Sequence, residues 1–117
     1  ARLGVLSNKP HRFTQLCADH FFPPGTFDIV LGQRDHVPRK PDPAAGLEIA
    51  AFLGLSPEEC AYIGDSGVDM AFGLAAGMRR IGVLWGFRGR EELISNGAEV
   101  LVSHPEQLLS LDFTAPL

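Results

Sequence analysis

The segment YIGDSGVD, Tyr62 to Asp69, joins a short apolar run to a polar turn and the start of a helix. The apolar run Ala61–Gly64 has the length of a buried strand. We expect a helix over Gly67–Ala76, because Gly77 supplies the usual C-terminal stop. A strand, a tight turn and a helix in this order form the repeating unit of a parallel sheet.

The rest of the chain repeats this unit. We expect further strands at Leu3–Leu6, Phe27–Gly32, Ile81–Trp85 and Glu99–Val102. We expect helices that begin at Pro10, at Pro43 with Asp42 as cap, at Arg90 and at Pro105, and a single capped turn at Ser56–Glu59. Strands that alternate with helices over short connections predict an α/β fold with a Rossmann-like, doubly wound parallel sheet.

Apolar residues at helical spacing predict the buried face of each helix. These residues are Phe13, Leu16, Cys17 and Phe21 in the first helix, Leu47, Ala50 and Ala51 in the second, and Met70, Leu74 and Ala75 in the third. Cys17 and Cys60 form no CxxC pair, so we expect two reduced core cysteines and a cytoplasmic location.

The composition limits the classes of partner. The chain has 117 residues, of which 45% are hydrophobic and 21% charged, and we expect one domain over residues 1–117. The net charge is -4 and the basic residues are scattered, which argues against a nucleic-acid or membrane surface. No secretion signal is recognisable at the start of the chain. A small-molecule or protein partner therefore fits better.

Polar residues follow the first expected strand at its carboxyl end, where ligands bind in doubly wound sheets. The Ser7 hydroxyl and backbone N-H groups near Asn8 can hydrogen-bond an anion such as phosphate. The alternative is that Ser7 and Asn8 only form a turn and cap a helix.

Lys9 and Lys40 are the only two lysines in the sequence, and both lie in segments marked by proline. The compact ammonium of Lys40, in RKPDP, can offset the charge of a phosphoryl group during its transfer. The alternative interpretation is a pair of solvated surface lysines.

Asp65 ends one strand, and Asp69 lies in the first turn of the helix that follows. A carboxylate at the end of a buried strand needs a cation, and Mg²⁺ prefers oxygen ligands with several retained waters. We therefore predict a metal site at Asp65 and Asp69, completed by a substrate phosphate and another carboxylate. For Asp69 alone, the helix dipole offers a simpler explanation.

The remaining candidates are weaker. The four histidines show no mutual ligand spacing, so we expect them at the surface or at helix ends. Trp85 and Phe87, with Arg88 and Arg90, either rim a pocket or form a packed aromatic pair with two arginines at a helix start.

Together, LSNKP, RKPDP and YIGDSGVDM resemble the second, third and fourth motifs of the haloacid dehalogenase superfamily, in the same order and on the same elements. The resemblance is closest to its phosphoglycolate phosphatases, which share the WGFR segment. It implies a Mg²⁺-dependent hydrolase that transfers the phosphoryl group of a small phosphate ester to an aspartate and then releases it to water.

The resemblance also implies roles for individual residues. Ser7 and the Asn8 backbone bind phosphate oxygens, and Lys9 lies beside them. Lys40 offsets charge between the phosphate and the nucleophile. Asp65 is a direct Mg²⁺ ligand, and Asp69 is its supporting carboxylate.

The sequence departs from the family pattern at one point, because it contains no Asp-x-Asp. The family's first motif, DxDGT, supplies the nucleophile, and a helical cap domain usually follows it. We therefore expect residues 1–117 to be the carboxyl-terminal part of a larger phosphatase and to lack turnover alone. A non-catalytic module that binds phosphate or a protein, and phosphoglucomutase or dehalogenase chemistry, are the alternatives.

The first motif also ends the central strand of the family's sheet. Without that strand, the strands that carry Ser7 and Asp65 have unpaired inner edges. We expect the gap to be filled by residues outside this sequence or by a second copy of the chain, or the two strands to pair directly.

Overall fold

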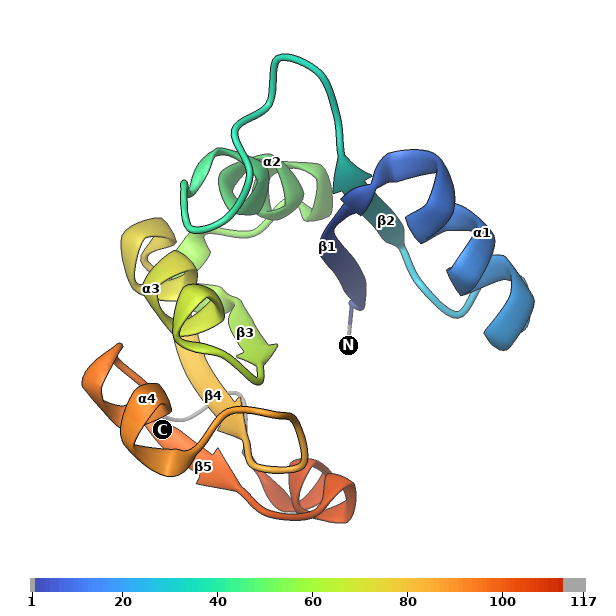
Figure 1. Cartoon of the computed structure of the whole chain (residues 1–117). Coiled ribbons are helices and arrows are strands. Elements are labelled where there is room, and N and C mark those ends of the chain that lie inside the picture. Colours follow the sequence, from blue (N-terminus) through green and yellow to red (C-terminus); the bar gives the residue numbers. More distant parts are fainter. Residues whose placement is uncertain (1, 113–117) are drawn as a thin grey trace.

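The computed structural model describes residues 2–112 and contains two parallel sheets (Figure 1). In the first sheet, β1 (Gly4–Pro10) pairs with β2 (Ile29–Gln33). The second sheet has the order β3 (Ala61–Gly64), β4 (Arg79–Val83) and β5 (Val100–Val102). Every pairing is parallel, so the predicted α/β class is confirmed.

Each helix begins within one residue of its predicted start. The helices are α1 (His11–Phe21), α2 (Ala44–Leu53), α3 (Gly67–Ala76) and α4 (Arg90–Ser95). Of these, α1 and α2 begin one residue after Pro10 and Pro43, respectively. Two 3₁₀ helices, η1 (Pro57–Glu59) and η2 (Pro105–Ser110), occupy the expected capped turn and the expected last helix. Across residues 2–112, no helix combines the length and the apolar character that crossing a bilayer requires.

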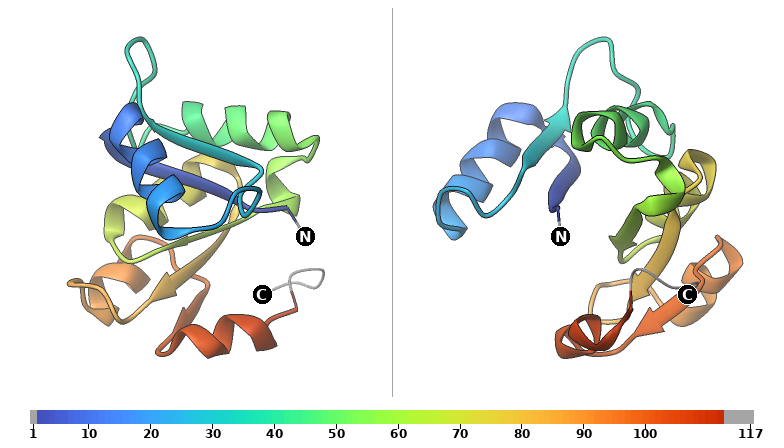
Figure 2. Two further views of the ribbon diagram at one scale, coloured as in Figure 1. Left: turned by 90° about the vertical axis from the view of Figure 1, so that its right-hand side faces the viewer. Right: turned by 180° about the vertical axis from the view of Figure 1, so that it is seen from behind.

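A gap separates the two sheets. Among the described residues, the inner edges of β1 and β3 pair with no strand, and α2 with the loop before it connects the two sheets above the gap (Figures 1 and 2). Direct pairing of these strands was one of the three expected ways to close the gap, and it is wrong. Each open edge presents backbone groups that can pair with an added strand.

The first strand is longer than predicted. Its polar half, SNKP, continues as strand rather than turning away, and Pro10 reaches the register of Gln33 after an irregularity that begins at Leu6. Pro10 therefore precedes α1 instead of opening it. The partner strand, which is distant in sequence, supports an extended conformation that local composition does not favour.

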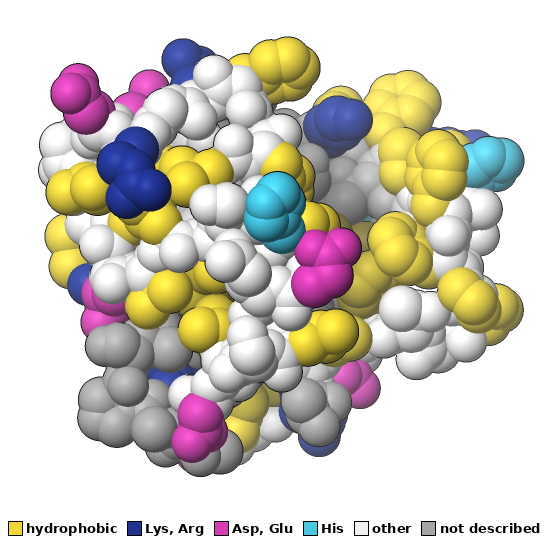
Figure 3. Space-filling view, turned by 90° about the horizontal axis from the view of Figure 1, so that it is seen from below, with side chains coloured by type: hydrophobic (Ala, Val, Ile, Leu, Met, Phe, Trp, Pro, Cys, Tyr) yellow, Lys and Arg dark blue, Asp and Glu magenta, His cyan; other side chains and the backbone are white. Residues whose placement is uncertain are grey.

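The predicted buried face of α1 is exposed. Phe13, Leu16 and Phe21 are each more than half exposed, and Cys17 is also exposed. Instead, α1 turns Thr14 inward, and its hydroxyl hydrogen-bonds the carbonyls of Lys9 and Pro10. Figure 3 shows hydrophobic side chains at the surface on the side of the molecule that α1 occupies. The prediction of a core cysteine is thus wrong for Cys17, while Cys60 is half-buried.

The main core lies between the second sheet and the helices α3 and α4. Its fully buried side chains are Met70, Phe72, Ile81 and Leu93. In α3 the prediction is right for Met70 and wrong for Leu74 and Ala75, which are exposed. In α2 it is right for Ala50, but Leu47 and Ala51 are exposed.

Gly46 lets α2 and α3 approach each other closely. A Cβ atom at Gly46 of α2 would lie 2.5 Å from Cζ of Phe72 in α3. The two helices therefore pack through a bare backbone and an aromatic ring, and apolar periodicity gives no sign of such a contact.

Candidate functional site

The turn after β3 fixes the side chain of Asp69. Its Oδ2 accepts hydrogen bonds from the Asp65 backbone N-H at 3.1 Å and from the Ser66 hydroxyl at 3.2 Å. Ser66 also caps α3, because its Oγ accepts from the Asp69 backbone N-H. A Cβ atom at Gly64 would lie 2.3 Å from that of Asp69. Glycine at this position therefore lets the carboxylate fold back against the strand.

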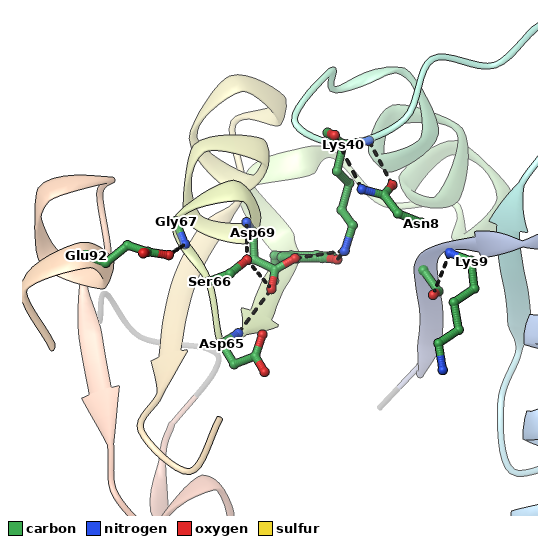
Figure 4. A network of polar contacts seen from close by, with 10 residues as sticks. Asn8, Lys9, Lys40, Asp65, Ser66, Gly67, Asp69 and Glu92 are labelled. Atoms are coloured by element: carbon green, nitrogen blue, oxygen red, sulfur yellow. Dashed lines mark hydrogen bonds and ion pairs between the residues drawn. The ribbon is translucent and has the colours of Figure 1, made fainter. Parts of the chain in front are cut away.

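Lys40 reaches this carboxylate from the loop before α2. Its ammonium donates to Asp69 Oδ1 at 2.8 Å and to the Tyr62 hydroxyl at 2.9 Å (Figure 4). The Lys40 and Asp69 side chains are each only 11% exposed. Because both ions are largely withdrawn from water, each depends on the other for its charge balance.

Burial and charge act in opposite directions on this cluster. Burial lowers the pKa of Lys40, but the Tyr62 oxygen and the hydrogen bond to Asp69 outweigh it, so the pKa lies above its ordinary value. Burial raises the pKa of Tyr62, and nearby Lys40 reverses only part of that rise. At neutral pH the cluster therefore contains an ammonium and an uncharged phenol.

Asn8 ties β1 to the same loop. Its Oδ1 accepts from the Lys40 backbone N-H at 3.1 Å, and its Nδ2 donates to the Lys40 carbonyl at 3.4 Å. The amide side chain thus makes two hydrogen bonds to the backbone of Lys40, while the lysine side chain extends toward Asp69 (Figure 4). The contact fixes the lysine between the two sheets.

Ser7 and Lys9 lie on β1, across the gap from Asp65. The Ser7 hydroxyl accepts from the Lys9 backbone N-H at 3.1 Å, and Lys9 is exposed. Both residues border a groove of about 220 Å³ between β1 and α1, which is otherwise lined mostly by apolar side chains such as Phe21 and Phe27. The structure therefore joins Asn8, Lys40 and the Asp65–Asp69 turn directly, and leaves Ser7 and Lys9 on the opposite wall.

Asp65 presents an open carboxylate at the end of β3. Within residues 2–112 its oxygens take part in no hydrogen bond or ion pair, and a Cβ at Gly86 would lie 2.4 Å from Asp65 Oδ2. The loop after β4 thus runs directly against this carboxylate.

This donor set fits part of a magnesium site. A free carboxylate is a suitable oxygen ligand for Mg²⁺, but both oxygens of Asp69 are already engaged. In the part of the chain that the structure describes, no three His, Cys, Asp or Glu side chains gather as a metal cluster. An ion bound at Asp65 would therefore need further oxygen ligands from a phosphate, from water or from another segment.

Other sequence candidates do not join the site. Trp85 is about half exposed and Phe87 fully exposed, so the packed aromatic pair is wrong. Neither residue lines the groove between β1 and α1. Of the histidines, three are exposed, and His11 accepts the Gly32 N-H at its Nδ1.

Sequence reasoning missed Tyr62 and Glu92. Tyr62 contacts Lys40, and strand alternation places it on the same face as Gly64, which is the signal that could have revealed it. Glu92 of α4 accepts the Gly67 N-H at the start of α3 at 2.8 Å, a contact between distant segments that carries no local signal.

Comparisons with known proteins agree with these motifs. A family model for haloacid dehalogenase-like hydrolase matches residues 1–77. A phosphoglycolate phosphatase of Xanthomonas campestris pv. campestris is 34% identical over 106 residues, which are 90% of this chain and 48% of that protein. The chain thus spans about half the length of the curated relatives it matches.

Solved structures share the fold. One, from Lactobacillus delbrueckii subsp. bulgaricus and provisionally described as a phosphoglycolate phosphatase, is 38% identical with a TM-score of 0.84. The match covers 92% of this chain and 44% of that one. A haloacid dehalogenase-like family hydrolase from Streptococcus pneumoniae has the same TM-score, and the match covers 93% of this chain and 51% of that one. Because the two sequences are only 22% identical, this match supports the fold alone.

Proposed function

Because the chain belongs to the haloacid dehalogenase-like hydrolase family, we propose that it forms part of a Mg²⁺-dependent phosphatase acting on a small phosphate monoester. The observation that carries this proposal is the buried Lys40 ammonium, held by Asp69 beside the open Asp65 carboxylate. A fixed cation next to a free carboxylate suits a phosphate oxygen on one side and a divalent ion on the other. The names of the first relatives make phosphoglycolate the substrate to test first.

Each residue has a role in this proposal. Lys40 contacts the phosphate and offsets its charge, and Ser7, the Asn8 backbone and Lys9 bind further phosphate oxygens. Asp69 supports the metal ligand indirectly, because it fixes both the backbone of Asp65 and the ammonium of Lys40.

Asp65 would hold the Mg²⁺. When bound, the ion would neutralise charge on the phosphate and complete its oxygen shell with ligands from outside the described site. The protein's own contribution is to keep the Asp65 carboxylate open and oriented, with Gly86 packed against it.

We propose that the nucleophile lies outside this chain. We propose the same for the residues that fill the gap between β1 and β3. A strand from another segment of a complete protein, or from a second copy of this chain, would pair with both open edges. The same open edges favour a second candidate function, a non-catalytic module that binds phosphate or a protein partner. The cytoplasmic location stays a prediction.

An activity assay separates the two functions. We expect no turnover of phosphoglycolate or p-nitrophenyl phosphate by this chain with Mg²⁺, and turnover by a complete protein that contains both this sequence and an upstream Asp-x-Asp. In that protein, Lys40→Met should lower kcat/KM at least about a hundredfold, and the control Arg12→Gln on exposed α1 should leave it unchanged. Ordinary turnover by the chain alone would contradict an external nucleophile.

A further inference from the structure

The ammonium of Lys40 is held at two of its three donor positions. An ammonium carries three N-H donors. One donates to Asp69 Oδ1 at 2.8 Å and another to the Tyr62 hydroxyl at 2.9 Å. Among the described residues, no acceptor takes the third, so the two bonds leave one N-H in a fixed direction for a ligand.

Tyr62 is itself held rigidly. Its ring packs edge-to-face on the fully buried Phe72, with ring centroids 4.6 Å apart. It also packs against the core cluster of Ala50, Ala76 and Met78, and the Lys40 Nζ lies 5.5 Å from its ring centroid. The hydroxyl is therefore an acceptor whose position is set by the core rather than by a flexible loop.

We infer that Tyr62 is a positioning residue for Lys40: its hydroxyl, together with Asp69, fixes the ammonium so that one N-H remains for the bound phosphate. This inference rests on the proposed function, in which Lys40 contacts the phosphate, and adds a residue to it. Tyr62 acts through Lys40 and does not need to touch the substrate.

The uncharged nature of the hydroxyl matters for this role. Asp69 already balances the charge of Lys40, so a second carboxylate in place of Tyr62 would leave the cluster with a net negative charge. Such a cluster would repel a phosphate. A phenol fixes the direction of the ammonium without adding negative charge.

The sequence makes the inference directly measurable. Because Lys9 and Lys40 are the only lysines, protein labelled with ¹⁵N in its lysine side chains gives two ammonium groups to compare. We expect ¹⁵N relaxation to show a rigid Lys40 ammonium and a mobile Lys9 ammonium. In Tyr62→Phe, which keeps the ring that packs on Phe72, the Lys40 ammonium should become mobile.

Chemical reactivity gives a second readout. Mass spectrometry measures the rate at which acetic anhydride modifies Lys40 at one fixed pH, with Lys9 as internal reference. This rate should rise about tenfold in Tyr62→Phe, because the charged ammonium loses one hydrogen bond. Ile63→Val is the matched control, since Ile63 points to the opposite face of β3 and is 43% exposed. It should change neither readout.

The outcomes are decisive without any catalytic assay. Equal mobility of the two lysines in the unchanged chain would overturn the inference even if Tyr62→Phe fails to fold. Unchanged Lys40 mobility and reactivity in a folded Tyr62→Phe would also overturn it. Because neither readout involves turnover, failure of the proposed function would show separately, in the activity assay.

Discussion

At the scale of single residues, the Lys40–Asp69 ion pair is the most consequential contact of the described chain. Each ion is 11% exposed, and each finds its main charge partner in the other. A buried pair of this kind adds little to stability as a whole, yet the removal of one partner leaves an uncompensated charge. The same pair fixes Asp65, so it links stability to the site.

We predict that Asp69→Ala lowers the free energy of unfolding by about 3 kcal/mol, because Lys40 is then left buried without its anion. Urea denaturation followed by circular dichroism measures this. Arg88→Ala is the control: the Arg88–Glu92 pair is an i,i+4 contact whose arginine side chain is 61% exposed, and its loss should cost less than about 0.5 kcal/mol. Equal losses of stability in Asp69→Ala and Arg88→Ala would contradict the prediction that Lys40 depends on a buried anion.

The pKa shifts predict a loss of stability in alkali. The folded-state pKa values of Lys40 and Tyr62 both lie above their ordinary values of 10.5 and 10.0. Groups with raised pKa values contribute their full stability below the unfolded-state pKa and lose it as the pH rises through the folded-state value. The free energy of unfolding should therefore fall above about pH 10, and fall less steeply in Tyr62→Phe. Parallel profiles for the two proteins would refute the assignment.

At the scale of elements, the contact between α2 and α3 depends on a glycine. A Cβ at Gly46 would lie 2.5 Å from Cζ of Phe72. We predict that Gly46→Ala lowers the free energy of unfolding by about 1–3 kcal/mol, because the fully buried ring cannot move aside without strain. Ala51→Ser, on the exposed side of the same helix, should change it by less than about 0.5 kcal/mol. Equal stability of both variants would rule out the tight contact.

The elements also show how far the sequence predicts the fold. The bounds of α3 and β3 follow from a local pattern that ends at Gly77, whose φ of 76° confirms the predicted stop. The local pattern does not predict which face of each helix is buried, because that depends on the elements that pack against the helix. Phe13, Leu16 and Phe21 of α1 stay more than half exposed in the described chain, and Gly46 carries no hydrophobic signal.

The site follows the same rule. Lys40, Asp65 and Asp69 could be proposed from the sequence because they follow the carboxyl ends of expected strands, where ligands bind in doubly wound sheets. Tyr62 resembles an ordinary strand residue, and only the folded structure brings the loop with Lys40 onto its hydroxyl. Ser7 and Asp65 lie at two separate sheets, and the local sequence pattern does not reveal that separation.

At the scale of the whole molecule, the open edges of β1 and β3 and the exposed face of α1 should make the chain associate. We predict that its weight-average mass in sedimentation equilibrium rises with concentration. Phe21→Lys, at a residue 72% exposed on α1, should shift this association at least about tenfold toward monomer. Leu109→Lys, at a residue 90% exposed on η2, should not. A monomer at every concentration would contradict this prediction.

The most direct test of the central claim is a calorimetric titration of the chain with inorganic phosphate, with and without Mg²⁺. If Lys40 and Asp65 share one site for an anion and a divalent ion, phosphate binds the unchanged chain more tightly with Mg²⁺ than without it. Asp65→Asn should remove this effect of Mg²⁺, and Lys40→Met should weaken phosphate binding at least about tenfold. Equal phosphate affinity in all three proteins, with and without Mg²⁺, would contradict the account.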